Sequence, residues 1–168
     1  MDAIEAIMTR RSIRKYTDQK IPDEAITQLL KAAMAAPSAH NRQPWHFIVI
    51  DDKSILNKIP EYHQYSKMLV GASHAIVVLA DTDIQETDFW MHDTSAATEN
   101  ILIAANAMGL GAVWLGVEPD EEKIIGTKEL LGVPDNVMPL SIVSLGYPLE
   151  KKTSRENYNE ERVHRNHW

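Results

Sequence analysis

HAIVVLA, residues 74–80, is a continuous apolar run. Such a run is typical of a β-strand that is buried on both faces of its sheet. Burial on both faces requires a layer of structure on each side of the sheet. The sequence therefore predicts a three-layer α/β/α sandwich, in which helices cover both faces of a central sheet.

Predicted helices and strands alternate on either side of this run. Helical spacing of apolar residues predicts helices after Asp2, from Asp23 to before Pro37, over 55–59, over about 91–108 and from Asp120 onward. Short β-rich runs predict strands over 46–50, 112–117 and 140–145. Asp2 with Glu5 predicts a capping box, and Gly109 predicts a helix C-terminus. Taken alone, this alternation indicates a parallel sheet.

Length and composition indicate one domain followed by a polar tail. The chain has 168 residues, of which 44% are hydrophobic and 24% are charged, as in ordinary globular proteins. The roughly twenty residues after Pro148 are mostly polar and cannot form a core of their own. We therefore expect a domain over residues 1–148 and a C-terminal extension over 149–168 that either hangs free or wraps around something.

Composition also excludes several classes of protein. No apolar run approaches the roughly 18 residues of a membrane span, and the N-terminus has no signal-peptide pattern, so we expect a cytoplasmic protein. The net charge of −7 argues against general nucleic-acid binding. The absence of cysteine excludes disulfides, iron–sulfur clusters and thiolate zinc sites. The seven histidines do not group, so we predict no metal site.

Positive charge gathers in residues 10–14, RRSIR, against this acidic background. The three guanidinium groups and the Ser12 hydroxyl could bind a phosphate through charge-assisted hydrogen bonds. The same residues also suit a helix C-terminus, where arginine complements the helix dipole. The local pattern by itself favours this second interpretation.

The loop of residues 36–47, APSAHNRQPWHF, is the second candidate for ligand contacts. A polar loop between two prolines that runs into a strand is a natural place for binding residues. It is equally typical of a helix-to-strand connection in which Ser38 and Asn41 cap turns. Its sequence alone favours the connection.

Three further features carry weaker signals. The glycines of residues 109–116, GLGAVWLG, lie between a helix and a following strand, so they are not a dinucleotide-binding motif. Gly116, at the end of that strand, would let a backbone N–H approach a flat ligand. Lys67 precedes the buried strand and is most simply a solvated side chain. Asp93 and Glu99 lie on the long predicted helix, where we expect them to face solvent or cap it.

Taken together, five segments in this order resemble the FMN-dependent nitroreductase family. They are RRSIR, APSAHNRQPWHF, SKMLVGASHAIVVLAD, AMGLGAVWLG and LLGVPDNVMPLSIVSLGYP, and they cover essentially the whole chain. The resemblance implies an α+β three-layer sandwich around a mixed, largely antiparallel sheet, in place of the parallel sheet. It also implies an obligate homodimer that holds FMN at the subunit interface, with residues 149–168 extended across the partner.

The resemblance further implies roles for particular residues. Arg10 and Ser12 match positions that hold the flavin phosphate and ribityl chain, and Arg11 between them is a further predicted cofactor contact. Arg14 and Lys67 match cations at the pyrimidine edge, with Gln64 as an amide partner. The remaining implied contacts are Pro37, Ser38, Asn41 and Gln43 toward the FMN of the other subunit, Leu115 against the ring, the Gly116 N–H near N5, and Arg155 in the tail. Many members carry a second basic residue where this chain has Asn157, and Arg162 is a nearby substitute.

The implied function is that of an NAD(P)H-dependent oxidoreductase. NAD(P)H would give a hydride to flavin N5, leave, and be replaced by a small electron-poor oxidant such as a nitroaromatic or a quinone. The flavin would carry the chemistry, so no side chain is predicted as an acid, base or nucleophile. The alternative is a flavin-binding or flavin-handling protein with little reductase turnover.

Overall fold

Four strands form one sheet in the computed structural model, which describes residues 1–153 and 156–168. The strands are β1 (Trp45–Ile50), β2 (His74–Asp81), β3 (Gly111–Gly116) and β4 (Val137–Gly146). Their order across the sheet is β1-β2-β4-β3, and every neighbouring pair is antiparallel. A single parallel bridge, between Ser12 and Ala112, adds the N-terminal segment to the outer edge of β3.

The parallel sheet expected from the alternation of helices and strands is therefore wrong. The strands β2 and β3, which helix α5 (Phe89–Ala107) connects, do run parallel, because each is antiparallel to β4. The last strand, β4, inserts between them and pairs with both. Alternation in the sequence cannot reveal such an insertion, whereas the antiparallel sheet implied by the family resemblance is confirmed.

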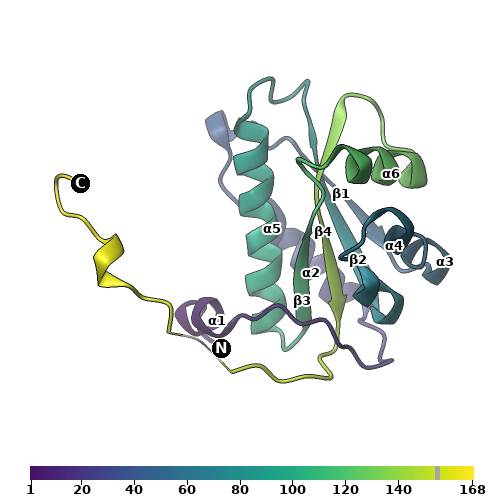
Figure 1. Cartoon of the computed structure of the whole chain (residues 1–168), viewed down its shortest axis with the longest axis horizontal. Helices are drawn as coiled ribbons and strands as arrows, with labels where there is room; N and C mark the ends of the chain where they lie inside the picture. Colours follow the sequence, from purple (N-terminus) through teal and green to yellow (C-terminus); the bar gives the residue numbers. More distant parts are fainter. Residues whose placement is uncertain (154–155) are drawn as a thin grey trace.

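Helices cover both faces of the sheet, as Figure 1 shows. One face carries α5 and α2 (Asp23–Met34), with the short helix α1 (Ala3–Thr9) near the end of α5. The other face carries α3 (Lys53–Leu56), α4 (Ile59–Tyr62), the 3-10 helix η2 (Lys67–Gly71) and α6 (Glu121–Leu131). The single helix expected over 55–59 is two short helices, α3 and α4, separated by Asn57 and Lys58.

Strand β2 is the buried centre of the sandwich. Residues 75–80 are each no more than 1% exposed. Successive side chains of a strand point to opposite faces, so Ile76 and Val78 join the core under α2 and α5, while Val77 and Leu79 join the core under α3, α4 and η2. The burial on both faces predicted from HAIVVLA is confirmed.

Local signals fix the ends of several helices. The Asp2 carboxylate caps α1 by accepting a hydrogen bond from the Glu5 N–H at 2.8 Å, and the Asp120 carboxylate caps α6. Gly109, just after α5, has φ of 74°, a left-handed conformation that favours glycine. These predicted helix boundaries are confirmed.

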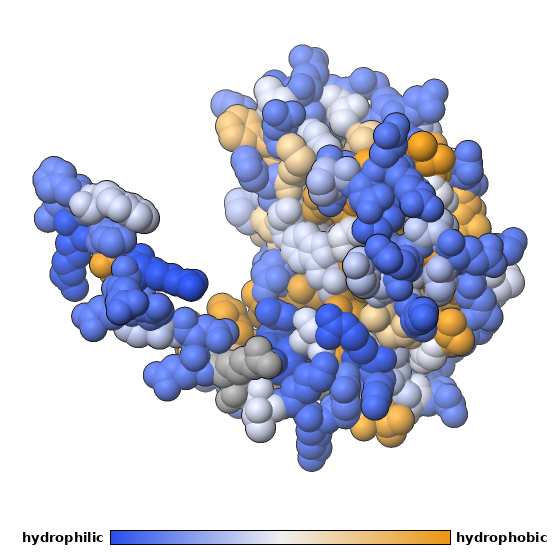
Figure 2. Space-filling view, viewed as in Figure 1, coloured by the Kyte–Doolittle hydropathy of each residue, from blue (hydrophilic) through white to orange (hydrophobic). Residues whose placement is uncertain are grey.

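Residues 149–153 still run along the N-terminal segment, where the Leu149 N–H donates to Lys15 O at 2.9 Å, whereas the C-terminal end of the chain extends away from the sandwich (Figure 1). Its surface is largely hydrophilic (Figure 2), apart from exposed Tyr158, Val163 and Trp168 and the adjoining Leu149. A short 3-10 helix, η3 (Glu160–Arg162), is its one regular element among the described residues. Across the described ranges, no helix is both long enough and apolar enough to cross a bilayer.

Two glycines of β3 provide a test of packing at the sheet edge. A Cβ atom at position 111 would lie 2.7 Å from Ile13 Cγ2 and 3.0 Å from Ile13 Cβ, too close for atoms that cannot rotate away. We expect Gly111→Ala to lower the free energy of unfolding of the apo-protein by about 1–3 kcal/mol through overpacking. At Gly116 a Cβ would meet only Glu118 O, at 3.9 Å, so Gly116→Ala should leave that stability unchanged. Urea unfolding of both variants, followed by circular dichroism, measures the difference, and equal losses would contradict it.

Candidate functional site

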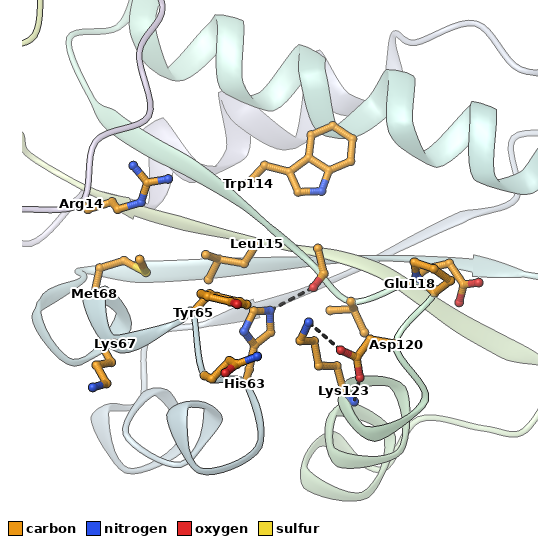
Figure 3. A pocket seen from close by; sticks show the side chains of 14 residues that line it. Arg14, His63, Tyr65, Lys67, Met68, Trp114, Leu115, Glu118, Asp120 and Lys123 are labelled. Carbon is orange, nitrogen blue, oxygen red and sulfur yellow. Dashed lines mark hydrogen bonds and ion pairs between the residues drawn. The ribbon is translucent and has the colours of Figure 1, made fainter.

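A cavity of about 840 Å³ lies beside the outer edge of β3 (Figure 3). Four parts of the chain line it: Arg14 after α1, the segment between α4 and η2 with the start of η2 (63–65, 67–68), the end of β3 (114–116), and the turn into α6 (117–120) with Lys123. Predicted site residues Arg14, Gln64, Lys67, Leu115 and Gly116 all lie here. These residues are far apart in the sequence, and the fold brings them together.

The outer edge of β3 presents backbone groups to this cavity. The Ile13 N–H donates to Ala112 O at 2.9 Å, and the His63 ring contacts Gly116 O through Nε2 at 3.0 Å. Because alternate residues of a strand direct their N–H and C=O groups to the same side, the Trp114 and Gly116 groups also point away from β4. The Gly116 N–H is thus on the side of the strand that faces the cavity.

Packing of the sandwich does not require a glycine at position 116. A Cβ atom at Gly111 or Gly146 would collide with Ile13 or Tyr16, whereas one at Gly116 would meet nothing closer than 3.9 Å. Packing of the sandwich therefore explains the first two glycines but not the third. Glycine at position 116 keeps the cavity wall open to a ligand.

Charged side chains lie at both ends of the cavity. Arg14 and Lys67 are at one end, next to the apolar Met68, and Lys123 with Asp120 is at the other (Figure 3). Lys123 Nζ lies 2.8 Å from Asp120 Oδ2, and this hydrogen bond lowers the pKa of the Asp120 carboxyl. Leu115 is buried and forms part of the apolar floor, together with Val117.

A second, polar hollow of about 430 Å³ shares Arg14 with the cavity. Its lining is Arg10, Arg11, Ser12, Arg14, Lys152 and Asn157. Arg10 is engaged here, because its Nε lies 3.2 Å from Glu99 Oε1, a half-exposed carboxylate on α5. Arg10 is the C-cap of α1, which ends at Thr9, so only the first residue of RRSIR lies at a helix C-terminus, and Arg11, Ser12 and Arg14 continue beyond it along the hollow.

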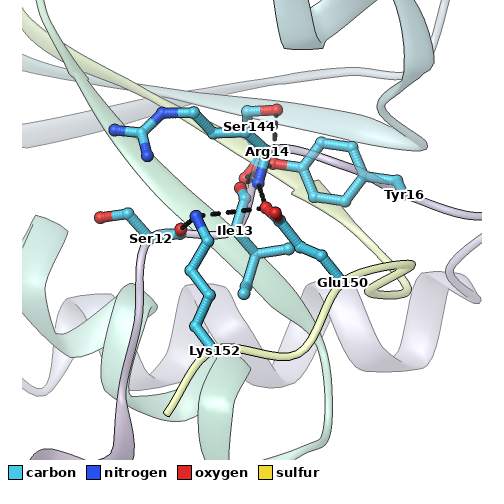
Figure 4. Close-up of polar contacts among 7 residues, drawn as sticks. All are labelled: Ser12, Ile13, Arg14, Tyr16, Ser144, Glu150 and Lys152. Atoms are coloured by element: carbon cyan, nitrogen blue, oxygen red, sulfur yellow. Dashed lines mark hydrogen bonds and ion pairs between the residues drawn. The ribbon is translucent and has the colours of Figure 1, made fainter. Parts of the chain in front are cut away.

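Lys152 is a residue of this hollow that the sequence interpretation missed. Its Nζ donates to Ser12 O at 2.6 Å and lies 3.3 Å from Glu150 Oε1, which also accepts from the Arg14 N–H at 2.7 Å (Figure 4). A lysine pair directly after the domain, at 151–152, was the available signal. Asn157 reaches the hollow as well, whereas predicted Arg155 lies outside the described residues.

Tyr16 holds the backbone that carries Arg14 (Figure 4). Its hydroxyl donates to Ile13 O at 2.7 Å and lies 3.0 Å from Ser144 Oγ on β4. Burial raises the pKa of the Tyr16 hydroxyl to about 12, so the hydroxyl keeps its proton and remains a donor. The backbone of Arg14 is therefore held in place against the sheet, although the Arg14 side chain is exposed.

The predicted loop contacts Pro37, Ser38, Asn41 and Gln43 line neither hollow of this chain. Gln43 N–H donates to Ser38 Oγ at 3.0 Å, and Gln43 Nε2 donates to Asn41 Oδ1 at 2.9 Å. His40, Asn41 and Gln43 all have φ between 50° and 55°, a conformation that is costly for residues other than glycine. The fold holds this loop in a strained shape without bringing it to the cavity.

Asp93 supports that loop from below, so the expectation that it faces solvent or caps α5 is wrong. Asp93 is 4% exposed, and its carboxylate accepts from the Ala39 N–H at 2.9 Å and from Gln85 Nε2 at 3.3 Å. A buried carboxylate needs such donors. Its helical position gave no sign of a partner more than fifty residues away.

His63 is the other site residue that the sequence interpretation missed. The residue is 1% exposed, and burial lowers the pKa of its imidazole. Its Nδ1 has no hydrogen-bond partner, and Glu118 Oε2, also at the cavity, has none either among the described residues. The sequence gave one signal only, a histidine close to Gln64 and Lys67.

The fold and the two hollows that share Arg14 define an α+β protein with a partly cationic candidate site. The nitroreductase family matches residues 7–64 and 59–147. A candidate NADH dehydrogenase/NAD(P)H nitroreductase from Archaeoglobus fulgidus is 51% identical, with 99% of each chain covered. Among solved structures, an FMN-dependent nitroreductase from Clostridium difficile has 33% identity and a TM-score of 0.92, with 98% of this chain and 99% of that chain covered. The chain belongs to the nitroreductase family.

A second solved relative was determined with a ligand. It is a candidate nitroreductase from Desulfovibrio desulfuricans in complex with FMN, 31% identical, with a TM-score of 0.86. The match covers 100% of this chain and 98% of that chain. The likeness thus extends over the whole of both proteins, including the region of the two hollows.

The two acidic residues of α5 provide a test of how the loop is held. Asp93→Asn removes the charge and one of two acceptors from a buried site, so we expect it to lower the free energy of unfolding by about 1.5–3 kcal/mol. Glu99→Gln, a matched change on the same helix, affects a half-exposed ion pair and should cost at most about 1 kcal/mol. Thermal unfolding of the apo-proteins compares them. A larger loss for Glu99→Gln would contradict the support that we assign to Asp93.

Proposed function

We propose that this protein is an FMN-dependent oxidoreductase that transfers hydride from NAD(P)H to a small electron-poor acceptor, such as a nitroaromatic or a quinone. The observation that carries the proposal is the pair of adjoining hollows that share Arg14. One hollow is polar and cationic, and the other has an apolar floor and an open backbone edge. FMN has the matching halves, since its phosphate and ribityl chain are polar and its ring is flat and largely apolar.

The residues present fit this cofactor in charge and in shape. The polar hollow offers Arg10, Arg11, Ser12 and Lys152, whose charge-assisted hydrogen bonds suit a phosphate. The cavity wall is free of a side chain at Gly116, where a flat ring needs close approach to backbone. When bound, FMN would supply the redox chemistry of hydride transfer between NAD(P)H and the oxidant.

The side chains of this protein then bind, orient and stabilise charge. Arg14 and Lys67 would hold positive charge at the pyrimidine edge, where negative charge gathers on reduction. Gln64 would donate from its amide at the same edge, and the Gly116 N–H would donate to the ring. The nicotinamide and the oxidant use one cavity in turn, so the kinetics are ping-pong. None of these steps requires a protein acid or base.

The site is completed by a second copy of the chain. The strained loop with Pro37, Ser38, Asn41 and Gln43 does not reach the cavity of its own chain, which suits a contact with the FMN of a partner. The exposed Ile4, Ile7 and Met8 of α1 provide apolar surface for such an interface. Residues 149–168 would extend across the partner, with Arg155 reaching the phosphate. We propose a cytoplasmic homodimer.

Anaerobic mixing separates this function from its alternative. The purified protein, reconstituted with FMN, should lose its yellow colour when NADH or NADPH is added, and colour should return with a quinone. A protein that binds FMN but keeps its colour with both nicotinamides would be the flavin-binding protein with little turnover. A protein that cannot be loaded with FMN would contradict the whole proposal.

Arg14→Met tests the charge at the pyrimidine edge. The change keeps much of the stem and removes a charge that favours reduced over oxidised flavin, so the two-electron midpoint potential should fall by tens of millivolts, about 30 mV corresponding to 1.4 kcal/mol. A redox titration with FMN-saturated protein measures it. Lys20→Met, which removes an exposed cation paired with Asp51, is the control and should leave the potential unchanged. An unchanged or raised midpoint potential for Arg14→Met would contradict the position of Arg14 at the pyrimidine edge.

Removal of residues 149–168 tests the tail and the dimer. The full chain should sediment as a homodimer with an interface of at least roughly 2,000 Å² in total, as obligate dimers have. The truncated chain should dissociate into monomers at a higher protein concentration than the full chain does. It should also bind FMN more weakly, because Lys152 and Asn157 are lost from the polar hollow. Analytical ultracentrifugation and FMN titration measure both. A full chain that binds FMN as a monomer would contradict the shared site.

A further inference from the structure

His63 joins two walls of the cavity that are far apart in the sequence. Its Nε2 contacts Gly116 O at 3.0 Å, on the open edge of β3 (Figure 3). A carbonyl oxygen can only accept, so Nε2 carries the proton and donates. The contact lies between the segment that carries Gln64 and Lys67 and the backbone of Gly116.

The segment of residues 63–67 contains two buried residues that fix the positions of three exposed ones. His63 and Ser66 are at most 1% exposed, and Ser66 donates to His63 O through Oγ at 2.7 Å and through its N–H at 3.0 Å. Gln64, Tyr65 and Lys67, between and beside these anchors, are exposed and line the cavity. A shift of the His63 ring would therefore move Gln64 and Lys67 relative to β3.

Packing alone does not explain a histidine at this position. With Nε2 as the donor, Nδ1 is an acceptor that is shielded from water and has no partner among the described residues. An unsatisfied buried acceptor reduces stability, and an apolar side chain of similar size would avoid that loss. What the histidine adds is the hydrogen bond to Gly116.

We propose that His63 is a positioning residue, whose hydrogen bond to Gly116 O sets the distance between the edge of β3 and Lys67 in the flavin site. This role rests on the proposed function. Burial lowers the pKa of the imidazole, and Lys123 acts in the same direction. The hydrogen bond to Gly116 O and the Asp120 carboxylate oppose that shift, and the net change is downward. His63 therefore positions the site without adding a positive charge to it.

The first test uses the apo-protein and does not depend on activity. Nitrogen-15 NMR of the histidine rings should show His63 with its proton on Nε2 at pH 7, and its titration midpoint should lie below the ordinary value of about 6.5. A proton on Nδ1, or a midpoint at or above the ordinary value, would overturn the assignment. Because FMN is absent, this result holds whether or not the protein is a reductase.

The second test uses the FMN-loaded protein and three variants. His63→Leu keeps the volume and removes the donor, so the rate of flavin reduction by NAD(P)H should fall roughly tenfold or more and the flavin absorption bands should shift. His63→Gln keeps an N–H donor and should restore most of both. His74→Gln is the control and should leave the rate unchanged. His74 is a buried histidine on β2, and Ser73 Oγ lies 2.8 Å from its Nδ1.

Each outcome decides the role of His63. A Leu variant with wild-type rate and spectrum, or a Gln variant no better than Leu, would overturn it. If melting of the apo-protein shows that the Leu variant does not fold, His63→Asn replaces it, because its amide is too short to reach Gly116 O. If the wild type binds FMN but NAD(P)H does not reduce the flavin, the proposed function fails. The NMR result and the shift in flavin absorption still decide the role of His63 in that case.

Discussion

The insertion of β4 between β2 and β3 is the constraint on which the site depends. Pairing with β4 satisfies one edge of β3 and leaves the other edge at the border of the sheet. An open edge presents unpaired N–H and C=O groups, which proteins normally cover or pair. Here the N-terminal segment covers one end through the Ser12–Ala112 bridge, and His63 covers Gly116 O. The stretch between these two contacts is where the cavity opens.

The distribution of charge follows from the same edge. The segment that pairs with β3 carries the RRSIR cations, so the pairing places them beside the cavity in a protein whose net charge is −7. Tyr16 and Ser144 hold that segment to β4, and Lys152 and Glu150 hold it from the tail side. A cationic hollow and a cavity with an apolar floor are thus adjacent because one backbone segment forms both the rim of the sheet and the source of positive charge.

Asp93 and His63 both carry buried acceptor atoms, but only those of Asp93 have donors. Asp93 has two donors and supports a strained loop, so its burial is compensated. Nδ1 of His63 has no donor, so its burial is not compensated within the chain. Such uncompensated groups are common at functional sites, where a loss of folding stability accompanies the fixed placement of a functional group. In this protein the uncompensated Nδ1 of His63 belongs to the ring that contacts the backbone proposed to face the flavin.

Much of the fold could be predicted from the order of the amino acids. The buried strand at HAIVVLA, the caps at Asp2 and Asp120 and the end of α5 at Gly109 depend on contacts within a few residues, so local patterns indicate them. Sheet direction, the partner of Asp93 and the roles of His63 and Lys152 depend on residues that are tens of positions apart. The insertion of β4, the burial of Asp93 and the reach of His63 to Gly116 therefore became visible only in the tertiary structure, because long-range pairing brings those groups together and no local pattern records it.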